Sequence, residues 1–240
     1  MSWWLIIPVY PGGFTLARQH FFKMVKQHPE ILCLFKKPSF WLCIFVLMSG
    51  LVAVLGCATP PPENKEDICA IFEEKRGWYK HAKQASERWG SPISVMMAII
   101  HHESGFDGSA QPPRKRILWI FPGSRPSTAY GYSQALDSTW DAYRQDSGNQ
   151  GADRDDFEDA IDFVGWYNNR SHKECGIEAN DTYSLYLAYH EGQAGFNRRT
   201  FKNKARLKKV AQNVSKRSAV YRGQLQRCQK SLEESSWWPF

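Results

Sequence analysis

From residue 66 onward, the pattern of apolar and polar positions is that of helices with one buried face. Apolar residues recur at intervals of three and four, the spacing that gathers side chains on one side of an α-helix. No segment shows convincing strand alternation, and no repeat is present. The sequence therefore predicts a compact all-α domain over residues 66–232, followed by a tail over 233–240. The expected helices cover residues 66–75, 78–89, 92–104 and 183–191, with others after residue 134 and from about 155, and a long last one that includes 207–228.

The expected helix over 92–104 carries the first candidate for chemistry. Ser91 is a typical N-cap, and Gly105 suits a helix end. Met96, Ile99 and Ile100 form an apolar stripe on one face of this helix, and the carboxylate of Glu103 continues the stripe at its end. A carboxylate in line with a buried stripe is partly desolvated, which raises its pKa toward the range of a general acid. The alternative is that Glu103 turns outward into water and has no role.

Residues 1–56 differ in composition from the rest of the chain. Basic residues precede an apolar run over 40–56, as in an export signal. The run ends in Leu-Val-Ala-Val-Leu-Gly before Cys57, which resembles a bacterial lipobox. We therefore expect a lipid on Cys57 and a proline-rich tether over 57–65. An uncleaved signal anchor is the alternative, and both interpretations place the following domain outside the cytoplasm.

Three cysteines follow Cys57, and an oxidising compartment permits one disulfide among them. Cys69 and Cys228 lie near the two ends of the predicted domain. Because domain ends are often close in space, we predict that these two cysteines pair. The alternative is that both, like Cys175, are small buried residues. No two cysteines have the spacing of metal ligands, so we expect no metal.

The formal net charge of +7 overstates that of the predicted domain, because residues 1–56 hold five Lys or Arg and one Glu. The remaining charge is segregated. Residues 137–162 are rich in acid, whereas 198–230 are basic and hold no acidic residue. A basic stripe can bind nucleic acid, a membrane surface or an anionic polymer. For an exported protein, nucleic acid is the least expected partner, and an ordinary solvated helix face is the simplest interpretation.

Three short motifs stand out: Glu103-Ser104-Gly105-Phe106, Gly131-Tyr132-Ser133-Gln134 and Ala188-Tyr189-His190-Glu191-Gly192. In this order they resemble the signature of the SLT domain of peptidoglycan lytic transglycosylases, over about residues 78–200. The resemblance implies a lysozyme-like helical fold with a substrate cleft, preceded by a lipoprotein signal. It implies a monomeric enzyme that needs no cofactor and binds peptidoglycan glycan strands. Its expected location is the periplasmic face of a Gram-negative envelope, as an outer-membrane lipoprotein held by its lipid anchor.

Members of the family cleave the β-1,4 bond between MurNAc and GlcNAc without water. A single Glu protonates the glycosidic oxygen and then takes the proton of the muramyl C6 hydroxyl, which closes a 1,6-anhydro ring. By the resemblance, Glu103 matches this catalytic position. An ordinary glycosidase uses two carboxylates, and no second acid of this sequence has a comparable setting.

The same match implies roles for other residues of the motifs. Ser104 would orient the substrate or the acid, and Gln134 would hydrogen-bond the sugar. Tyr189 would donate to Glu103, and Tyr132 is a further orienting candidate. The alternatives are core packing for Tyr189 and helix capping for Gln134.

The sequence departs from the family pattern in three places. His190 stands where the family usually has Asn, and an imidazole titrates near neutral pH. Ser133 replaces a Met, which alters the apolar floor of the expected cleft. The segment over 107–130 is longer than usual, and its aromatic patch around Trp119 either stacks on sugars or seals the core.

Three other functions are open at this point. A metal hydrolase would use the side chains of His101, His102, Glu103, His190 and Glu191, but no His-Glu-x-x-His motif is present. A lysozyme-type hydrolase would deliver water with the help of Asp107 or Asp137. A non-catalytic lipoprotein would bind the wall without turnover.

Overall fold

The structure, a computed structural model, describes residues 59–114, 116–117 and 121–236. The chain from residue 58 onward forms one compact unit, and the predicted all-α class is confirmed. The described helices are α4 (Ile68–Glu74), α5 (Trp78–Trp89), α6 (Ile93–Ser104), α7 (Asp137–Ser147), α8 (Phe157–Cys175), α9 (Thr182–Glu191), α10 (Gln193–Asn197) and α11 (Ala205–Ser236).

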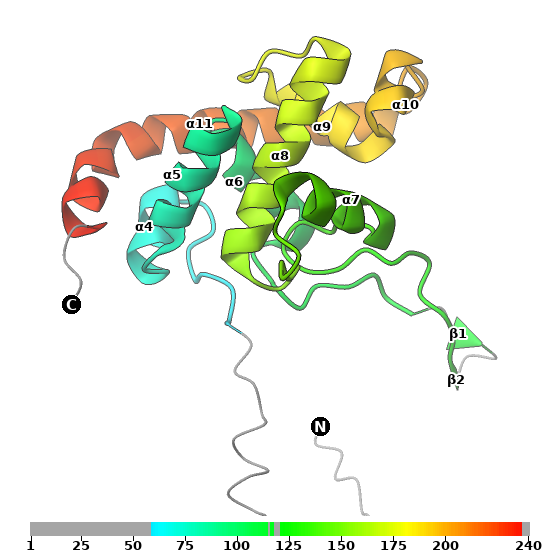
Figure 1. The fold of residues 1–240 in the computed structure, drawn as a ribbon, viewed down its shortest axis with the longest axis horizontal. Helices are drawn as coiled ribbons and strands as arrows, with labels where there is room; N and C mark the ends of the chain where they lie inside the picture. The colour runs from blue at the N-terminus through cyan, green and yellow to red at the C-terminus, as the bar shows by residue number, and fades with distance from the viewer. Residues whose placement is uncertain (1–58, 115, 118–120, 237–240) are drawn as a thin grey trace, which may run out of the picture. The chain divides into compact units, whose positions relative to one another are not determined.

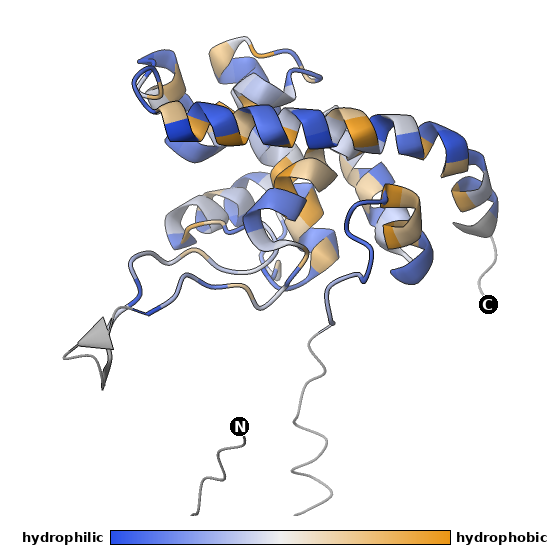
Figure 2. Cartoon of the chain, turned by 180° about the vertical axis from the view of Figure 1, so that it is seen from behind, coloured by the Kyte–Doolittle hydropathy of each residue, from blue (hydrophilic) through white to orange (hydrophobic). Residues whose placement is uncertain are grey.

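Helix α6 is the centre of this unit. Residues 94–100 are all buried, because α5, α8 and α11 pack around this helix. Helix α11 runs behind α5 and α8 in Figure 1 and crosses in front of the other helices in Figure 2, where its outer face is largely hydrophilic. Gly105 ends α6 in the left-handed conformation, with φ of 58°, as a C-terminal glycine typically does. The packing therefore leaves Glu103 in the last turn of a buried helix.

Acidic residues cap three of the described helices, and the first of them is Asp67 at the start of α4. The Asp156 side chain accepts hydrogen bonds from two backbone N–H groups at the start of α8, and Asp181 does the same for one N–H of α9. Such caps satisfy backbone donors that lack a partner within the helix. Asp156 and Asp181 thus have a structural role.

A disulfide joins α4 to α11. It links Cys69 to Cys228, the pair predicted from the sequence, with 6.0 Å between their Cα atoms. Cys175 is a free thiol. Helix α11 makes its other main contacts with α6 and α9. The disulfide therefore adds a covalent link between the first and the last described helix of the unit.

Several element boundaries differ from the prediction. Helix α6 begins at Ile93, and Ser91 is not its cap. Instead Ser91 is 2% exposed and its hydroxyl accepts a hydrogen bond from Asn168 of α8. Helix α10 and an antiparallel pair of two-residue strands, β1 (Arg116–Ile117) and β2 (Phe121–Pro122), were not predicted. Elements this short leave no periodic pattern.

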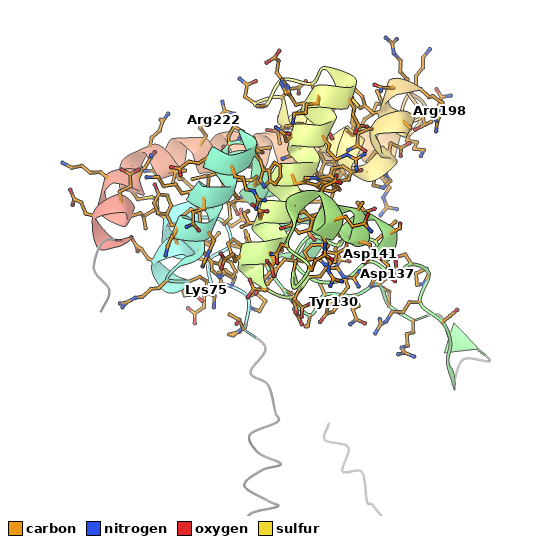
Figure 3. All side chains as sticks on the ribbon, in the orientation of Figure 1. Lys75, Tyr130, Asp137, Asp141, Arg198 and Arg222 are labelled. Carbon is orange, nitrogen blue, oxygen red and sulfur yellow. A yellow bond between two sulfur atoms is a disulfide. The ribbon has the colours of Figure 1, made fainter. Side chains whose placement is uncertain are left out.

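In Figure 3, Arg198 and Arg222 lie above Asp137 and Asp141 of α7.

Among the described residues, no helix is both long and apolar enough to cross a bilayer. The expected export signal, Cys57 and Trp119 lie outside the described residues.

Candidate active site

The Glu103 carboxyl group lies in the last turn of α6, in line with side chains that are fully buried. Met96, Ile99 and Ile100 have no exposed surface. Burial raises the pKa of Glu103 from 4.5 to about 7, because an apolar setting disfavours the charged form. A hydrogen bond with Tyr186 acts in the opposite direction and lowers this pKa. The group can therefore hold or release a proton near neutral pH.

Two tyrosines of α9 lie close to this carboxyl group. They are three residues apart and so share one face of the helix. The Tyr186 side chain is 3% exposed, and burial, as the largest cause, together with the charge of Glu103 raises the pKa of its hydroxyl. The Tyr189 hydroxyl donates to the backbone carbonyl of Ser133, at 2.6 Å. Burial, as the largest cause, and then the charge of Glu103 raise the pKa of Tyr189. The predicted hydrogen bond from Tyr189 to Glu103 was therefore wrong, because the Tyr189 hydroxyl donates to the Ser133 carbonyl instead.

Gln134 belongs to a tight turn that is closed by an isolated backbone bridge between Tyr130 and Ala135. Its backbone has φ of 51°, in the left-handed region. The Gln134 amide donates to the carbonyls of Ala110 and Gly131, each at 2.9 Å. The side-chain N–H groups of Gln134 thus donate to the backbone of the protein. Its side-chain carbonyl is left to accept a hydrogen bond from a sugar.

Tyr132 was predicted to orient substrate, and this prediction was wrong. Its side chain is 2% exposed. The ring packs edge-on against Trp78 and Phe157, with centroids 5.7 Å from each. Trp78 and Phe157 in turn stack on each other at 3.7 Å. Aromatic burial of this kind stabilises the core, and it takes Tyr132 away from any substrate.

Ser104 and His190 are more accessible. The Ser104 hydroxyl donates to the carbonyl of Ile100, a bond within α6. His190 is exposed, with Nδ1 3.1 Å from a carboxylate oxygen of Glu191. Lys204 pairs with Glu191 at 2.7 Å and, as the largest cause, lowers its pKa to about 2. Glu191 is therefore an anion held by an ammonium group rather than a candidate acid.

The two carboxylates considered as helpers of a water molecule have partners of their own. Asp107 accepts hydrogen bonds from the backbone N–H and hydroxyl of Ser109, at 2.8 and 2.7 Å. Asp137 pairs with Arg154 at 2.9 Å. Neither carboxylate is a cause of the shifted pKa of Glu103, which reflects burial and Tyr186 alone.

Tyr186 is the site residue that sequence reasoning missed. It precedes the third motif, so the resemblance gave no reason to select it. The available signal was its spacing of three from Tyr189, which places both on one helix face. That spacing does not say which hydroxyl reaches the acid.

A helical domain with one desolvated carboxyl group beside a hydroxyl donor fits the class of enzymes that cleave glycosidic bonds by general acid catalysis. Comparison with protein families matches residues 45–228 to the transglycosylase SLT domain, and the chain belongs to this family. The match includes all three motifs and confirms the resemblance seen in the sequence. No curated protein sequence matches significantly. The protein is thus a peptidoglycan-acting, envelope-associated member of a transglycosylase family.

Proposed function

We propose that Glu103 is the only acid and base of a lytic transglycosylase reaction. The enzyme cleaves the β-1,4 bond between MurNAc and GlcNAc and leaves a 1,6-anhydro-MurNAc end. The pKa of about 7 at Glu103 carries this proposal, since one group can act as acid and then as base only if both forms are accessible at the working pH.

The proton path has two steps. The Glu103 carboxyl first gives its proton to the glycosidic oxygen as the bond from that oxygen to the muramyl C1 breaks. The resulting carboxylate then takes the proton of the C6 hydroxyl as its oxygen bonds to C1. No water is consumed, and Glu103 regains its proton. The carbonyl oxygen of Gln134, the Ser104 side chain and the exposed His190 are proposed contacts for the sugar.

Digestion of purified sacculi tests this function. We expect products with anhydro ends, which are lighter than reducing ends by one water, and we expect Glu103→Gln to abolish their release. The matched control Glu178→Gln alters an exposed carboxylate and should leave release unchanged. Reducing ends would indicate a lysozyme-type hydrolase, and binding without release would indicate a non-catalytic wall protein. Undiminished release by Glu103→Gln would overturn the role of Glu103.

We also propose that lipid on Cys57 anchors the protein to the outer membrane. The lipobox pattern supports this, and the disulfide between Cys69 and Cys228 fits an oxidising compartment. Cys57→Ala should lose incorporation of labelled palmitate and leave the membrane fraction, whereas Cys175→Ala should do neither. Continued membrane association of Cys57→Ala without palmitate would favour the signal-anchor alternative.

A further inference from the structure

The link between α10 and α11 carries three exposed cations, Arg198, Arg199 and Lys202, which we call the cationic corner. Among the described residues, none of these three side chains has an ion pair or a hydrogen-bond partner. Helix α11 then begins at Ala205 with no acidic residue in its first turn, although the helix macrodipole favours acids there. The start of α11 therefore leaves the charge of the corner unbalanced.

Two acids contact residues beside the corner, and each already holds another cation. Both carboxylate oxygens of Glu191 accept from the Lys204 ammonium group, at 2.7 and 2.8 Å. The backbone carbonyl of Glu174 accepts from the Asn197 side chain, while its carboxylate pairs with Arg170 at 2.9 Å. The positive charge of the corner is thus left for water or for an anion from outside the chain.

The backbone of the cationic corner is held in one conformation. Arg199 has φ of 58°, in a region that residues other than glycine seldom adopt. Its N–H donates to the Phe196 carbonyl at 2.8 Å, and its own carbonyl accepts from the N–H of Lys202 at 3.0 Å. The rings of Phe196 and Phe201 stack with centroids 5.3 Å apart. Unusual backbone angles held in this way cluster at binding sites, and a fixed backbone lowers the entropic cost of binding.

The corner is also joined to His190, a proposed contact for the sugar. Thr200 and Lys204 both donate to the carboxylate of Glu191, and Nδ1 of His190 lies 3.1 Å from the same carboxylate. Each residue of the corner is within two positions of Thr200 or Lys204, which is at most about 8 Å along the backbone. A sugar that contacts His190 therefore lies beside the corner.

We propose that the cationic corner binds carboxylates of the peptide stem, so that the substrate is a peptide-bearing glycan strand rather than a bare one. This inference rests on the proposed function, because it takes the sugar at His190 to belong to peptidoglycan. The stem is attached to the MurNAc whose C1 bond is cleaved, so it leaves the cleft near that bond. Guanidinium and ammonium groups are the usual partners of carboxylates. Lipid phosphates have the same charge, but no bond ties them to the sugar.

Sedimentation with purified sacculi tests the corner. Every protein is the full chain in detergent and carries Glu103→Gln, so that the sacculi are not consumed. Adding Arg198→Gln/Lys202→Gln should weaken binding to intact sacculi roughly 2- to 10-fold at low salt, because each exposed pair contributes little. High salt should remove this difference, since it screens exposed charges.

The matched control is Arg76→Gln/Lys80→Gln, which removes the same two kinds of charge from exposed residues at the start of α5. In Figure 3, Lys75, the neighbour of Arg76, lies on the opposite side of the molecule from Arg198. The control should bind sacculi as its parent does. An equal loss in the control, or unchanged binding by the corner variant, would overturn the proposal. The second result is also the one expected if the corner faces a lipid surface.

Sacculi stripped of their stems by an amidase give a second measurement, which needs no change at the corner. The Glu103→Gln parent should bind stripped sacculi less tightly than intact ones, and the corner variant should bind stripped sacculi as the parent does. A loss that persists on stripped sacculi would refute recognition of the stem. Failure of the proposed function has a separate signature, because release of fragments by the Glu103→Gln parent concerns turnover, whereas the comparison of intact and stripped sacculi concerns binding alone.

Discussion

The Tyr189 hydroxyl donates to the backbone carbonyl of Ser133 at 2.6 Å and thereby joins α9 to the turn over 130–135. Ser133 is fully buried, so its carbonyl has no ready substitute for this donor. The next residue, Gln134, is held by two further hydrogen bonds to the backbone. The second and third sequence motifs are therefore physically connected, although 56 positions separate Ser133 and Tyr189.

Tyr189→Phe should destabilise the protein by about 1–3 kcal/mol, since it leaves a buried carbonyl without a donor. It should also weaken sugar binding, because the turn that carries Gln134 loses its link to α9. Urea unfolding and the KM for soluble glycan fragments measure the two effects. The partly exposed Tyr183 of the same helix provides the control: Tyr183→Phe should change neither. Unchanged stability of Tyr189→Phe would mean that the hydrogen bond contributes nothing.

Gly131→Ala should be the most damaging single methyl addition in the site. An added Cβ would lie 2.0 Å from the carbonyl oxygen of Arg154, and Gly131 has φ of +75°. Gly148 has a nearly equal φ of +77° but open space around it, so Gly148→Ala isolates the conformational cost of about 1–2 kcal/mol. Gly131→Ala should exceed that loss and reduce turnover as the turn is displaced. Thermal unfolding measures the loss of stability in both variants. Equal losses in the two would contradict the predicted clash at Gly131.

The stability of the protein should depend on pH through Glu103. The native state holds this proton between pH 4.5 and about 7, where the unfolded chain has released it. The native state thus binds more protons in this window, and the free energy of unfolding falls as pH rises. Each pKa unit corresponds to about 1.4 kcal/mol, so the total fall is about 3 kcal/mol.

Glu103→Gln removes this dependence and serves as its measurement. Its stability relative to the wild type should rise by about 3 kcal/mol between pH 4 and pH 8. Chemical denaturation of both proteins across this range gives the difference, in which the titrations of other groups cancel. A difference that does not change with pH would mean that Glu103 is exposed to water in solution.

Reduction of the disulfide should cost about 2–5 kcal/mol of unfolding free energy, because the bond links residues 159 positions apart and so constrains a long loop of the unfolded chain. Cys69→Ser should show the same loss without reductant and no further loss with it. Cys175→Ser keeps the disulfide and should respond to reductant as the wild type does. Equal denaturation midpoints with and without reductant would show that packing alone holds α11 in place.

Much of the fold was predictable because helical periodicity is a local property. The helix expected over 78–89 coincides with α5, and Gly105 marked the end of α6. The start of α6 was not predictable, because Ser91 turns inward to accept a hydrogen bond from Asn168, 77 positions away. The two-residue strands are too short to leave a pattern. Neighbours from distant parts of the chain override local preference at such points.

By itself, the sequence determined the class of helical domain, the acid on the buried face of α6 and the pair of cysteines that joins the ends of the unit. These follow from periodicity, from family motifs and from the proximity of domain ends. Only the tertiary structure decided that Tyr189 hydrogen-bonds the Ser133 carbonyl and that Tyr132 belongs to the core. Hydrogen bonds form between specific atoms over about 3 Å. Only the packing of α9 against α8 and α11 and its hydrogen bond to the turn set such distances, and no spacing along the chain encodes them.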